Sequence, residues 1–375
     1  MSSDHPATRR RATLGIKISL LLVSIVVGLL LLEGAVRIRQ KIRYGTTTGN
    51  AFQIVPDPAT GLQIPLPGQD TGRIKINGEG FRSPEIPKAR PDGTVRLAFM
   101  GASTTFCAEV SSNEATWPAL VTKGLQERYP DVAFDYVNAG VPGYGLGSIR
   151  KALDLRVAPY NPNVIIFYEA TNDLMGDTRE IAARQGLFHD MAAEPSPLAK
   201  VSVGWYLIEK KMIAWRREKA TASGVVLSYD PDSLAGVFAE RLTGFLDDAK
   251  KITPVTAVAT FAHKYRRDQP PKVALANARW SLYYNPYQSV ENMIRSFESY
   301  NRAIRATAQA NGAILVDGED SIPGDDAHFA DSIHFTDEGA RAMAARVLRA
   351  LEGAPEFQKL VEQEKKPGSA KARAS

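Results

Sequence analysis

Cysteine is almost absent from this chain. Cys107 is the only one among 375 residues, which excludes an intrachain disulfide, a zinc cluster built from cysteines and a redox pair of thiols. Nucleotide-binding signatures are lacking too, because neither a Gly-x-x-x-x-Gly-Lys-Ser/Thr loop nor a glycine-rich dinucleotide fingerprint follows the first expected strand. We therefore expect no cofactor.

A basic surface for nucleic acid is also lacking. The chain has 46 Lys and Arg against 41 Asp and Glu, but residues 1–43 alone hold eight basic and two acidic residues. Residues 44–375 have a net charge of −1. The basic excess belongs to the N-terminal segment, which indicates that nucleic acid is not a partner.

The main long hydrophobic run lies near the N-terminus, between Ile18 and Leu32. With polar residues reaching water at both ends, it is long enough to cross a bilayer. We expect an N-terminal tail at 1–13 and a transmembrane helix at 14–36. A cleaved signal peptide is the alternative, but the run is followed almost at once by basic residues instead of a clear cleavage site.

Basic residues flank this run on both sides, so charge alone does not orient it. A short N-terminal tail usually stays in the cytoplasm. We therefore expect a single-pass protein of the inner membrane, with its large domain on the periplasmic or extracytoplasmic side.

Short apolar strands alternate with helices over most of the remaining chain. We expect an N-terminal extension at 37–94 with a hairpin around Asn77 and Gly78, a main domain at 95–352 and a flexible tail at 353–375. The expected strands are 95–100, 133–138, 163–168, 255–260 and 313–317, and the expected helices are 113–128, 146–158, 233–251, 288–310 and 337–352. This alternation predicts an α/β fold of three layers, α/β/α, with a central parallel sheet.

Four loops that follow expected strands carry the chemistry. Ser103 lies in "FMGASTTF", Gly143 in "NAGVPGYG", Asn172 in "EATND", and Asp331 with His334 in "DSIHFTDEG". Ligands of parallel sheets bind beyond the carboxyl ends of the strands, so these loops share one edge. The set resembles the SGNH (GDSL-type) hydrolase family in its membrane-anchored bacterial form, whose four blocks carry serine, glycine, asparagine and histidine in this order. The resemblance covers 95–352 apart from an insertion at about 177–231, and it implies a flavodoxin-like fold.

The resemblance also implies roles for these residues. Ser103 would be the nucleophile, His334 the general base and Asp331 the residue that orients the imidazole, because a serine hydroxyl needs a correctly held base to accept its proton. The backbone N–H groups of Ser103 and Gly143 and the side-chain amide of Asn172 would form the oxyanion hole. The implied protein is a serine esterase that hydrolyses an acyl or acetyl ester of an envelope glycan or lipid.

Two departures from the family pattern stand out. "GAS" replaces Gly-Asp-Ser, and Ala-Thr-Asn-Asp replaces Gly-x-Asn-Asp, yet neither change removes a catalytic group. The Gly-x-Ser-x-Gly elbow of the α/β-hydrolases is absent. A second Asp-x-x-His pair, Asp325 with His328, competes with the first, but only the Asp331 pair is followed directly by a helix cap at Thr336. The remaining histidines lie at unrelated spacings, so no metal site is expected.

Other interpretations stay open at this stage. Each site residue alone also has an ordinary explanation: Ser103 and Asn172 suit helix caps, Gly143 suits a turn, and His334 suits a buried, hydrogen-bonded position in the core. The same triad serves an O-acyltransferase that passes the acyl group to a glycan, and a non-catalytic envelope binding or assembly protein can keep the fold. Within the insertion, Trp205, Ile208, Met212 and Trp215 recur at helical spacing. We expect this stripe to pack on the domain, with a lid or an interfacial helix as the alternative.

Overall fold

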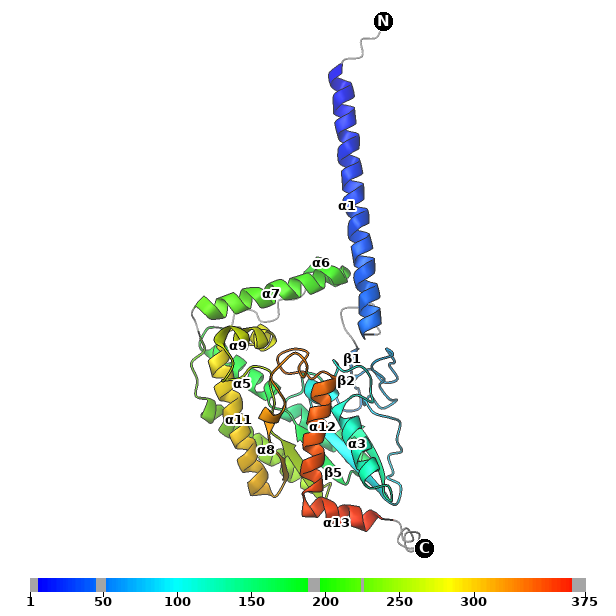
Figure 1. Ribbon diagram of the computed structural model, residues 1–375, viewed down its shortest axis with the longest axis vertical. Coiled ribbons are helices and arrows are strands. Elements are labelled where there is room, and N and C mark those ends of the chain that lie inside the picture. The colour runs from blue at the N-terminus through cyan, green and yellow to red at the C-terminus, as the bar shows by residue number, and fades with distance from the viewer. Residues whose placement is uncertain (1–5, 45–51, 188–195, 224–225, 366–375) are drawn as a thin grey trace. The chain divides into compact units, whose positions relative to one another are not determined.

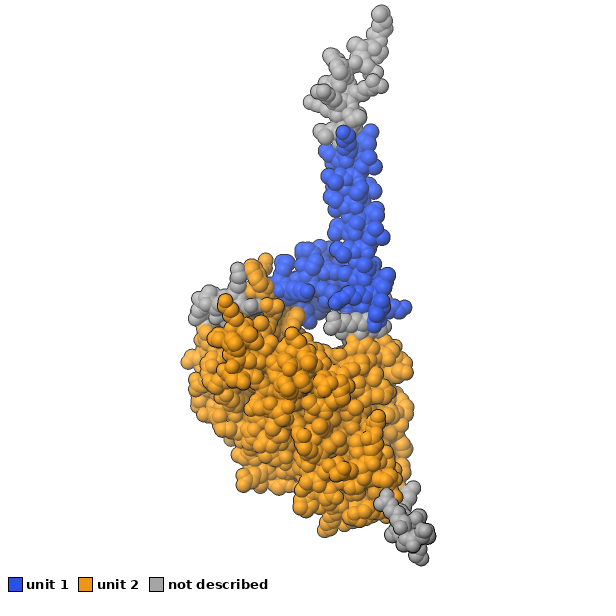
Figure 2. Space-filling view, in the orientation of Figure 1, with its two compact units in different colours: residues 1–51, 193–212 blue, residues 52–192, 213–375 orange. Residues whose placement is uncertain are grey.

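The structure is a computed structural model, and it describes residues 6–44, 52–187, 196–223 and 226–365. The chain divides into two compact units (Figure 2). Unit 1 comprises residues 1–51 and 193–212, and unit 2 comprises residues 52–192 and 213–375. The expected strands and the four candidate site loops all belong to unit 2.

The centre of unit 2 is a five-stranded parallel sheet with the strand order β4-β3-β5-β6-β7 (Figure 1). Its strands are β3 (Thr94–Gly101), β4 (Ala133–Asn138), β5 (Val164–Tyr168), β6 (Val255–Ala259) and β7 (Ile314–Val316). The three middle strands, β3, β5 and β6, are buried along their whole length, as expected where helices cover both faces of a parallel sheet. The predicted fold class is confirmed.

Helices form the outer layers of unit 2. The helices α3 (Trp117–Arg128) and α12 (Asp337–Glu352) pack against each other, and α8 (Pro231–Lys250) packs against α11 (Val290–Asn311) and α4 (Leu146–Ala152). Polar caps explain where they begin: the side chains of Thr116, Asp230, Ser289 and Thr336 each accept a backbone N–H of the first turn. The helix at α4 continues as a π-turn, η1 (Leu153–Val157), and a short 3-10 turn, η2 (Ala158–Tyr160).

Shorter elements complete the described chain. They are β1 (Ile54–Pro56), β2 (Gln63–Pro65), α2 (Ser103–Phe106), α5 (Thr171–Arg184), α6 (Pro197–Val201), α7 (Val203–Ser223), α9 (Pro271–Asn277), α10 (Arg279–Tyr284), η3 (Glu319–Ser321) and α13 (Pro355–Glu364).

The predicted hairpin around Asn77 and Gly78 is wrong. The Asn77 side chain instead accepts the backbone N–H groups of Glu79 and Phe81 and holds this segment in a turn. Antiparallel pairing nearby lies before this turn, at an isolated bridge between Asp70 and Lys75 and in backbone hydrogen bonds from Gly68 to Asn77 and from Ile76 to Gln69. The extension forms its two-stranded antiparallel sheet earlier, between β1 and β2.

The predicted flexible tail at 353–375 is wrong for its first part. Helix α13 occupies Pro355–Glu364 and buries Phe357, Leu360 and Val361. These side chains lie three and four residues apart, which places them on one helix face. Residues 366–375 lie outside the described chain.

Unit 1 contains the hydrophobic run as part of helix α1 (Pro6–Tyr44). Within it, Ile16–Ile42 is long and apolar enough to cross a membrane, by length and composition. A signal sequence meets the same criteria of length and composition. The helix therefore shows that this segment can enter a bilayer, as an anchor or as a signal sequence. Residues 6–13 of the expected N-terminal tail are helical as well.

Candidate active site

Ser103 is the first residue of the short helix α2, two positions after β3 ends at Gly101. The turn between them is very tight, because a Cβ at Gly101 would lie 2.2 Å from the Thr105 side-chain oxygen and 2.4 Å from the Tyr168 carbonyl oxygen. The buried Asn138 amide donates a hydrogen bond of 3.1 Å to the Thr105 carbonyl and holds α2 in place. The strand end and its neighbours therefore fix the position of the serine.

His334 reaches Ser103 from a loop that lies 231 residues later in the chain. The distance from His334 Nε2 to Ser103 Oγ is 2.8 Å, and His334 Nδ1 lies 2.7 Å from Asp331 Oδ2. Asp331 Oδ1 accepts the backbone N–H groups of Ile333 and His334, both at 2.9 Å. A continuous chain of hydrogen bonds thus joins a carboxylate, an imidazole and a hydroxyl.

The competing pair, Asp325 and His328, has nearly the same local geometry. His328 Nδ1 lies 2.7 Å from Asp325 Oδ1, and Asp325 also accepts the His328 backbone N–H. The loop packs closely on α12, since a Cβ at Gly339 would lie 2.0 Å from the His328 carbonyl oxygen. Of the two histidines, His334 is the one hydrogen-bonded to Ser103.

Gly143 and Asn172 come from neighbouring loops. Gly143 has a φ of +86°, which favours glycine. The Asn172 side-chain amide donates a hydrogen bond of 2.9 Å to the carbonyl of Tyr144, the residue after Gly143. The same glycine-rich loop lies against α2, because a Cβ at Gly140 would come within 2.5 Å of the Phe106 backbone nitrogen. The loops of Ser103, Gly143 and Asn172 therefore meet at one edge of the sheet.

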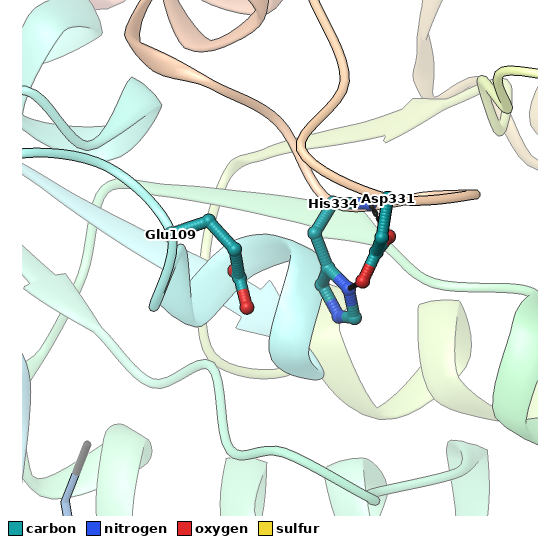
Figure 3. A group of neighbouring side chains, drawn as sticks. All are labelled: Glu109, Asp331 and His334. Atoms are coloured by element: carbon teal, nitrogen blue, oxygen red, sulfur yellow. Dashed lines mark hydrogen bonds and ion pairs between the residues drawn. The ribbon is translucent and has the colours of Figure 1, made fainter. Parts of the chain in front are cut away.

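Glu109 is a further acidic group at this site that the sequence did not reveal. One ligand atom from each of Glu109, Asp331 and His334 lies within 4.8 Å of the others, and Figure 3 shows the Glu109 carboxylate facing the imidazole. Its Oε2 is buried and has no hydrogen-bond partner among the described residues. Glu109 lies in an irregular loop between α2 and α3, so no spacing in the sequence points to it.

These charges shift the pKa values of the group. Burial by itself lowers the pKa of His334, but attraction to Asp331 and Glu109 outweighs burial and raises it to about 10. For Asp331, burial acts to raise the pKa, whereas the attraction and hydrogen bond of His334 hold it below the ordinary carboxyl value. Burial raises the pKa of Glu109. The imidazole between two carboxylates therefore holds its proton more tightly than a free one.

Glu169 is a second buried acid that the sequence did not reveal. It follows β5, and its Oε1 accepts the backbone N–H of Asn172 at 2.6 Å. Burial raises the pKa of Glu169 to about 8. Asp173, the residue after Asn172, accepts the backbone N–H of Leu146 at 2.8 Å. These two acids fix the start of α5, and with it Asn172, against the glycine-rich loop.

Glu109, Asp331 and His334 are also the described residues best placed to hold a metal ion. The donor set fits a cation poorly, because both ring nitrogens of His334 are already hydrogen-bonded, one to Asp331 and the other to Ser103. An ion would have to break one of these bonds. The arrangement suits proton transfer from Ser103 better than metal coordination.

The sequence of this chain matches a family of known proteins, and its fold is similar to solved structures. The sequence model of the GDSL-like lipase/acylhydrolase family matches residues 99–342, which is more than half of the chain. No curated protein sequence matches the chain. Among solved structures, Axe2, an acetylxylan esterase from Geobacillus stearothermophilus, is similar with 15% identity and a TM-score of 0.43, over 70% of this chain and 95% of that one. LAE5, an alpha/beta hydrolase enzyme from the metagenome of Lake Arreo in Spain, is similar with 14% identity and a TM-score of 0.42, over 68% and 94%.

The family match spans the loops of Ser103, Gly143 and Asn172 and the Asp331–His334 loop. It includes four of the five strands in full and the C-terminal end of β3, from Phe99 to Gly101. The chain therefore belongs to the GDSL-like lipase/acylhydrolase family, and it is a hydrolase that acts on carboxylic ester bonds.

Proposed function

We propose that this protein is a serine esterase that removes an acyl or acetyl group from an envelope glycan or lipid, with Ser103, His334 and Asp331 as its catalytic triad. The observation that carries the proposal is the continuous hydrogen-bond chain from Asp331 through His334 to Ser103 Oγ. A serine hydroxyl becomes a nucleophile when a neighbouring base accepts its proton, and a carboxylate on the far nitrogen holds that base in the right tautomer.

The reaction follows from these contacts. His334 Nε2 accepts the proton of Ser103 Oγ while the oxygen attacks the ester carbonyl and forms a tetrahedral intermediate. His334 then gives the proton to the departing alcohol oxygen as the C–O bond breaks, which leaves an acyl group on Ser103. Water, deprotonated by His334, attacks the acyl-enzyme and releases the carboxylic acid, and the proton returns to Ser103.

The oxyanion of the intermediate would be met by three N–H donors, from the backbone of Ser103, the backbone of Gly143 and the side chain of Asn172. An amide has two N–H hydrogens. One of those on Asn172 is directed to the Tyr144 carbonyl, and this contact leaves the second for the substrate. The hydrogen bond from the Asn172 backbone N–H to the Glu169 carboxylate holds the backbone that carries this side-chain amide in place. Donors held in place before the reaction stabilise charge in the transition state at little cost in reorganisation.

The raised pKa makes His334 a stronger base once the imidazole has lost its own proton. A more basic imidazole accepts the serine proton more readily, although a smaller fraction of the enzyme is in the neutral form at pH 7. Glu109 contributes to this rise through its charge. We therefore assign Glu109 as a positioning residue that acts through His334.

The same proposal places the enzyme at a membrane. The exposed side chains of α1 are apolar from Ile18 through Leu32 apart from Ser19, Ser24 and Gly28, as expected for a helix that lipid surrounds. We propose that α1 is an uncleaved single-pass anchor in the inner membrane, with the hydrolase domain on the periplasmic side. An ester of an envelope glycan or lipid is the substrate class found on that side.

Active-site labelling tests the proposed triad. A fluorophosphonate probe reacts with an activated serine, so we expect it to label the wild-type protein and to leave Ser103→Ala and His334→Ala unlabelled. Ser111→Ala is a matched control, because Ser111 is an exposed serine that bonds to Asp337, and it should be labelled as the wild type is. Labelling of Ser103→Ala at the wild-type level would overturn the assignment.

A further inference from the structure

The apolar stripe predicted in the insertion is exposed within unit 1. We define the outer apolar face as Leu198, Val201, Trp205, Ile208 and Met212, all in unit 1, whose exposed fractions run from 36% for Trp205 to 70% for Val201. Trp215, 53% exposed, extends this face along α7 by about one turn. No described residue of unit 1 covers this face, and an exposed apolar face of this kind is typical of a surface that contacts another apolar environment.

A carboxylate of helix α1 holds the start of α7. Glu33 Oε1 accepts the Val203 backbone N–H, and Glu33 Oε2 accepts the Gly204 N–H, both at 2.9 Å. The Ser202 hydroxyl donates to the same carboxylate at 2.8 Å. The first N–H groups of a helix have no partner within the helix, and their partial positive charge attracts an anion. Glu33 therefore caps α7 from a different helix.

A second contact fastens α6 to α1. The Arg37 guanidinium, one turn after Glu33, donates to the Val201 carbonyl at 3.1 Å and to the Glu33 carboxylate at 2.7 Å. Ser196, the cap of α6, bonds through its hydroxyl to Glu209 on α7 at 2.5 Å. Figure 1 shows α6 meeting the C-terminal part of α1, and α7 running away from α1 instead of alongside it.

The place where these contacts meet α1 sets their depth in a bilayer. The uncharged part of α1 from Ile18 to Leu32 is about 22 Å long at about 1.5 Å per residue, and the flanking side chains of Lys17 and Glu33 can reach toward the two edges of a hydrocarbon layer about 30 Å thick. Glu33 directly follows it, so the carboxylate lies where the hydrocarbon ends. Helices α6 and α7 are thus attached to α1 at the level of the lipid headgroups.

We propose that the outer apolar face of α6 and α7 binds the surface of the bilayer that α1 spans, as an interfacial amphipathic helix. The proposal rests on the membrane anchor proposed above. Tryptophan favours this depth, and the exposed basic residues Lys211 and Arg216 flank the apolar positions of α7. Basic residues beside an apolar face are typical of helices that lie in the plane of a membrane with anionic lipids.

Lipid with bromine atoms on its acyl chains tests this proposal, because bromine quenches tryptophan fluorescence only at short range. The full chain is reconstituted into vesicles with and without brominated lipid, and Trp205→Phe is compared with the wild type. Trp280→Phe is the matched control, the same substitution on α10 of unit 2. Hydrolysis of a water-soluble ester at the wild-type rate verifies that each variant is folded.

We expect brominated lipid to quench the wild-type protein, Trp205→Phe to lose a substantial part of that quenching, and Trp280→Phe to keep it. Equal quenching in the wild type and Trp205→Phe, with the protein still floating with the vesicles after alkaline washing, would overturn this inference alone. This result is also expected if a second copy or another protein covers the face, since Trp205 is then shielded from lipid. A full chain that does not float overturns the anchor and the inference together.

Discussion

Replacing Glu109 with glutamine removes one negative charge that faces the proposed base. The ligand atoms of Glu109 and His334 lie within 4.8 Å of each other. At this separation two unit charges interact by about 0.9 kcal/mol in water and by about 3.5 kcal/mol at an effective dielectric constant of about 20. One pKa unit corresponds to about 1.4 kcal/mol, so Glu109→Gln should lower the pKa of His334 by about 0.6 to 2.5 units.

The sign of the effect on activity follows from the role of His334. Only the neutral imidazole accepts the serine proton, so kcat/KM rises with pH as His334 loses its own proton. Because the pKa of His334 is raised to about 10, we expect the wild-type acid limb to lie well above the ordinary range of histidine. Glu109→Gln should move this limb to lower pH and increase the fraction of maximal activity that is reached at pH 7.

The assay is the pH dependence of kcat/KM on a water-soluble ester. Glu127→Gln is the matched control. Glu127 is an exposed helix residue whose ion pair with Lys123 spans 3.8 Å, and the acid limb of this variant should coincide with that of the wild type. If the acid limb of kcat/KM in Glu109→Gln coincides with that of the wild type, Glu109 carries no charge in the pH range where His334 loses its proton. A limb moved to higher pH would refute the electrostatic reasoning altogether.

Three further substitutions, two of them paired with a control variant, give distinct outcomes. Asn172→Ala should lower kcat about 100-fold or more with little change in KM, because an oxyanion donor acts mainly in the transition state. Asp331→Asn should lower kcat by about 10⁴-fold through the wrong imidazole tautomer, whereas Asp325→Asn should leave steady-state kinetics almost unchanged. Gly101→Ala places a Cβ 2.2 Å from a threonine oxygen and should lower the free energy of unfolding by about 1–3 kcal/mol in a denaturant titration. Gly176→Ala is the control, because nothing lies within 4 Å of a Cβ at this position, and it should not lower the free energy of unfolding.

The sheet could be predicted because its strands carry a strong local signal. A strand covered by helices on both faces reads as a continuous apolar run, as in β3 and β5. Since parallel strands end at the same edge, four loops distant in sequence could also be assigned to one place. The hairpin prediction failed where a side chain decided the outcome, because Asn77 bonds to the backbone and replaces strand pairing with a turn.

Residue spacing leaves open what lies next to a correctly predicted element. The helical spacing of Trp205, Ile208 and Met212 was clear, but periodicity shows only that a helix has an apolar face and does not identify the surface that covers it. Glu109 was missed for a related reason. Its approach to His334 depends on the path of an irregular loop, which no residue spacing encodes.

The repeated Asp-x-x-His pair separates local from distant contributions to the site. In both pairs the aspartate accepts the histidine backbone N–H, and the ring Nδ1 lies 2.7 Å from a carboxylate oxygen. Four residues are therefore enough to build an oriented imidazole. What distinguishes His334 is the partner of its other nitrogen, because the order of β3 within the sheet brings Ser103 Oγ to 2.8 Å from Nε2. A local motif supplies the base, and the topology of the sheet selects which of the two copies meets a hydroxyl.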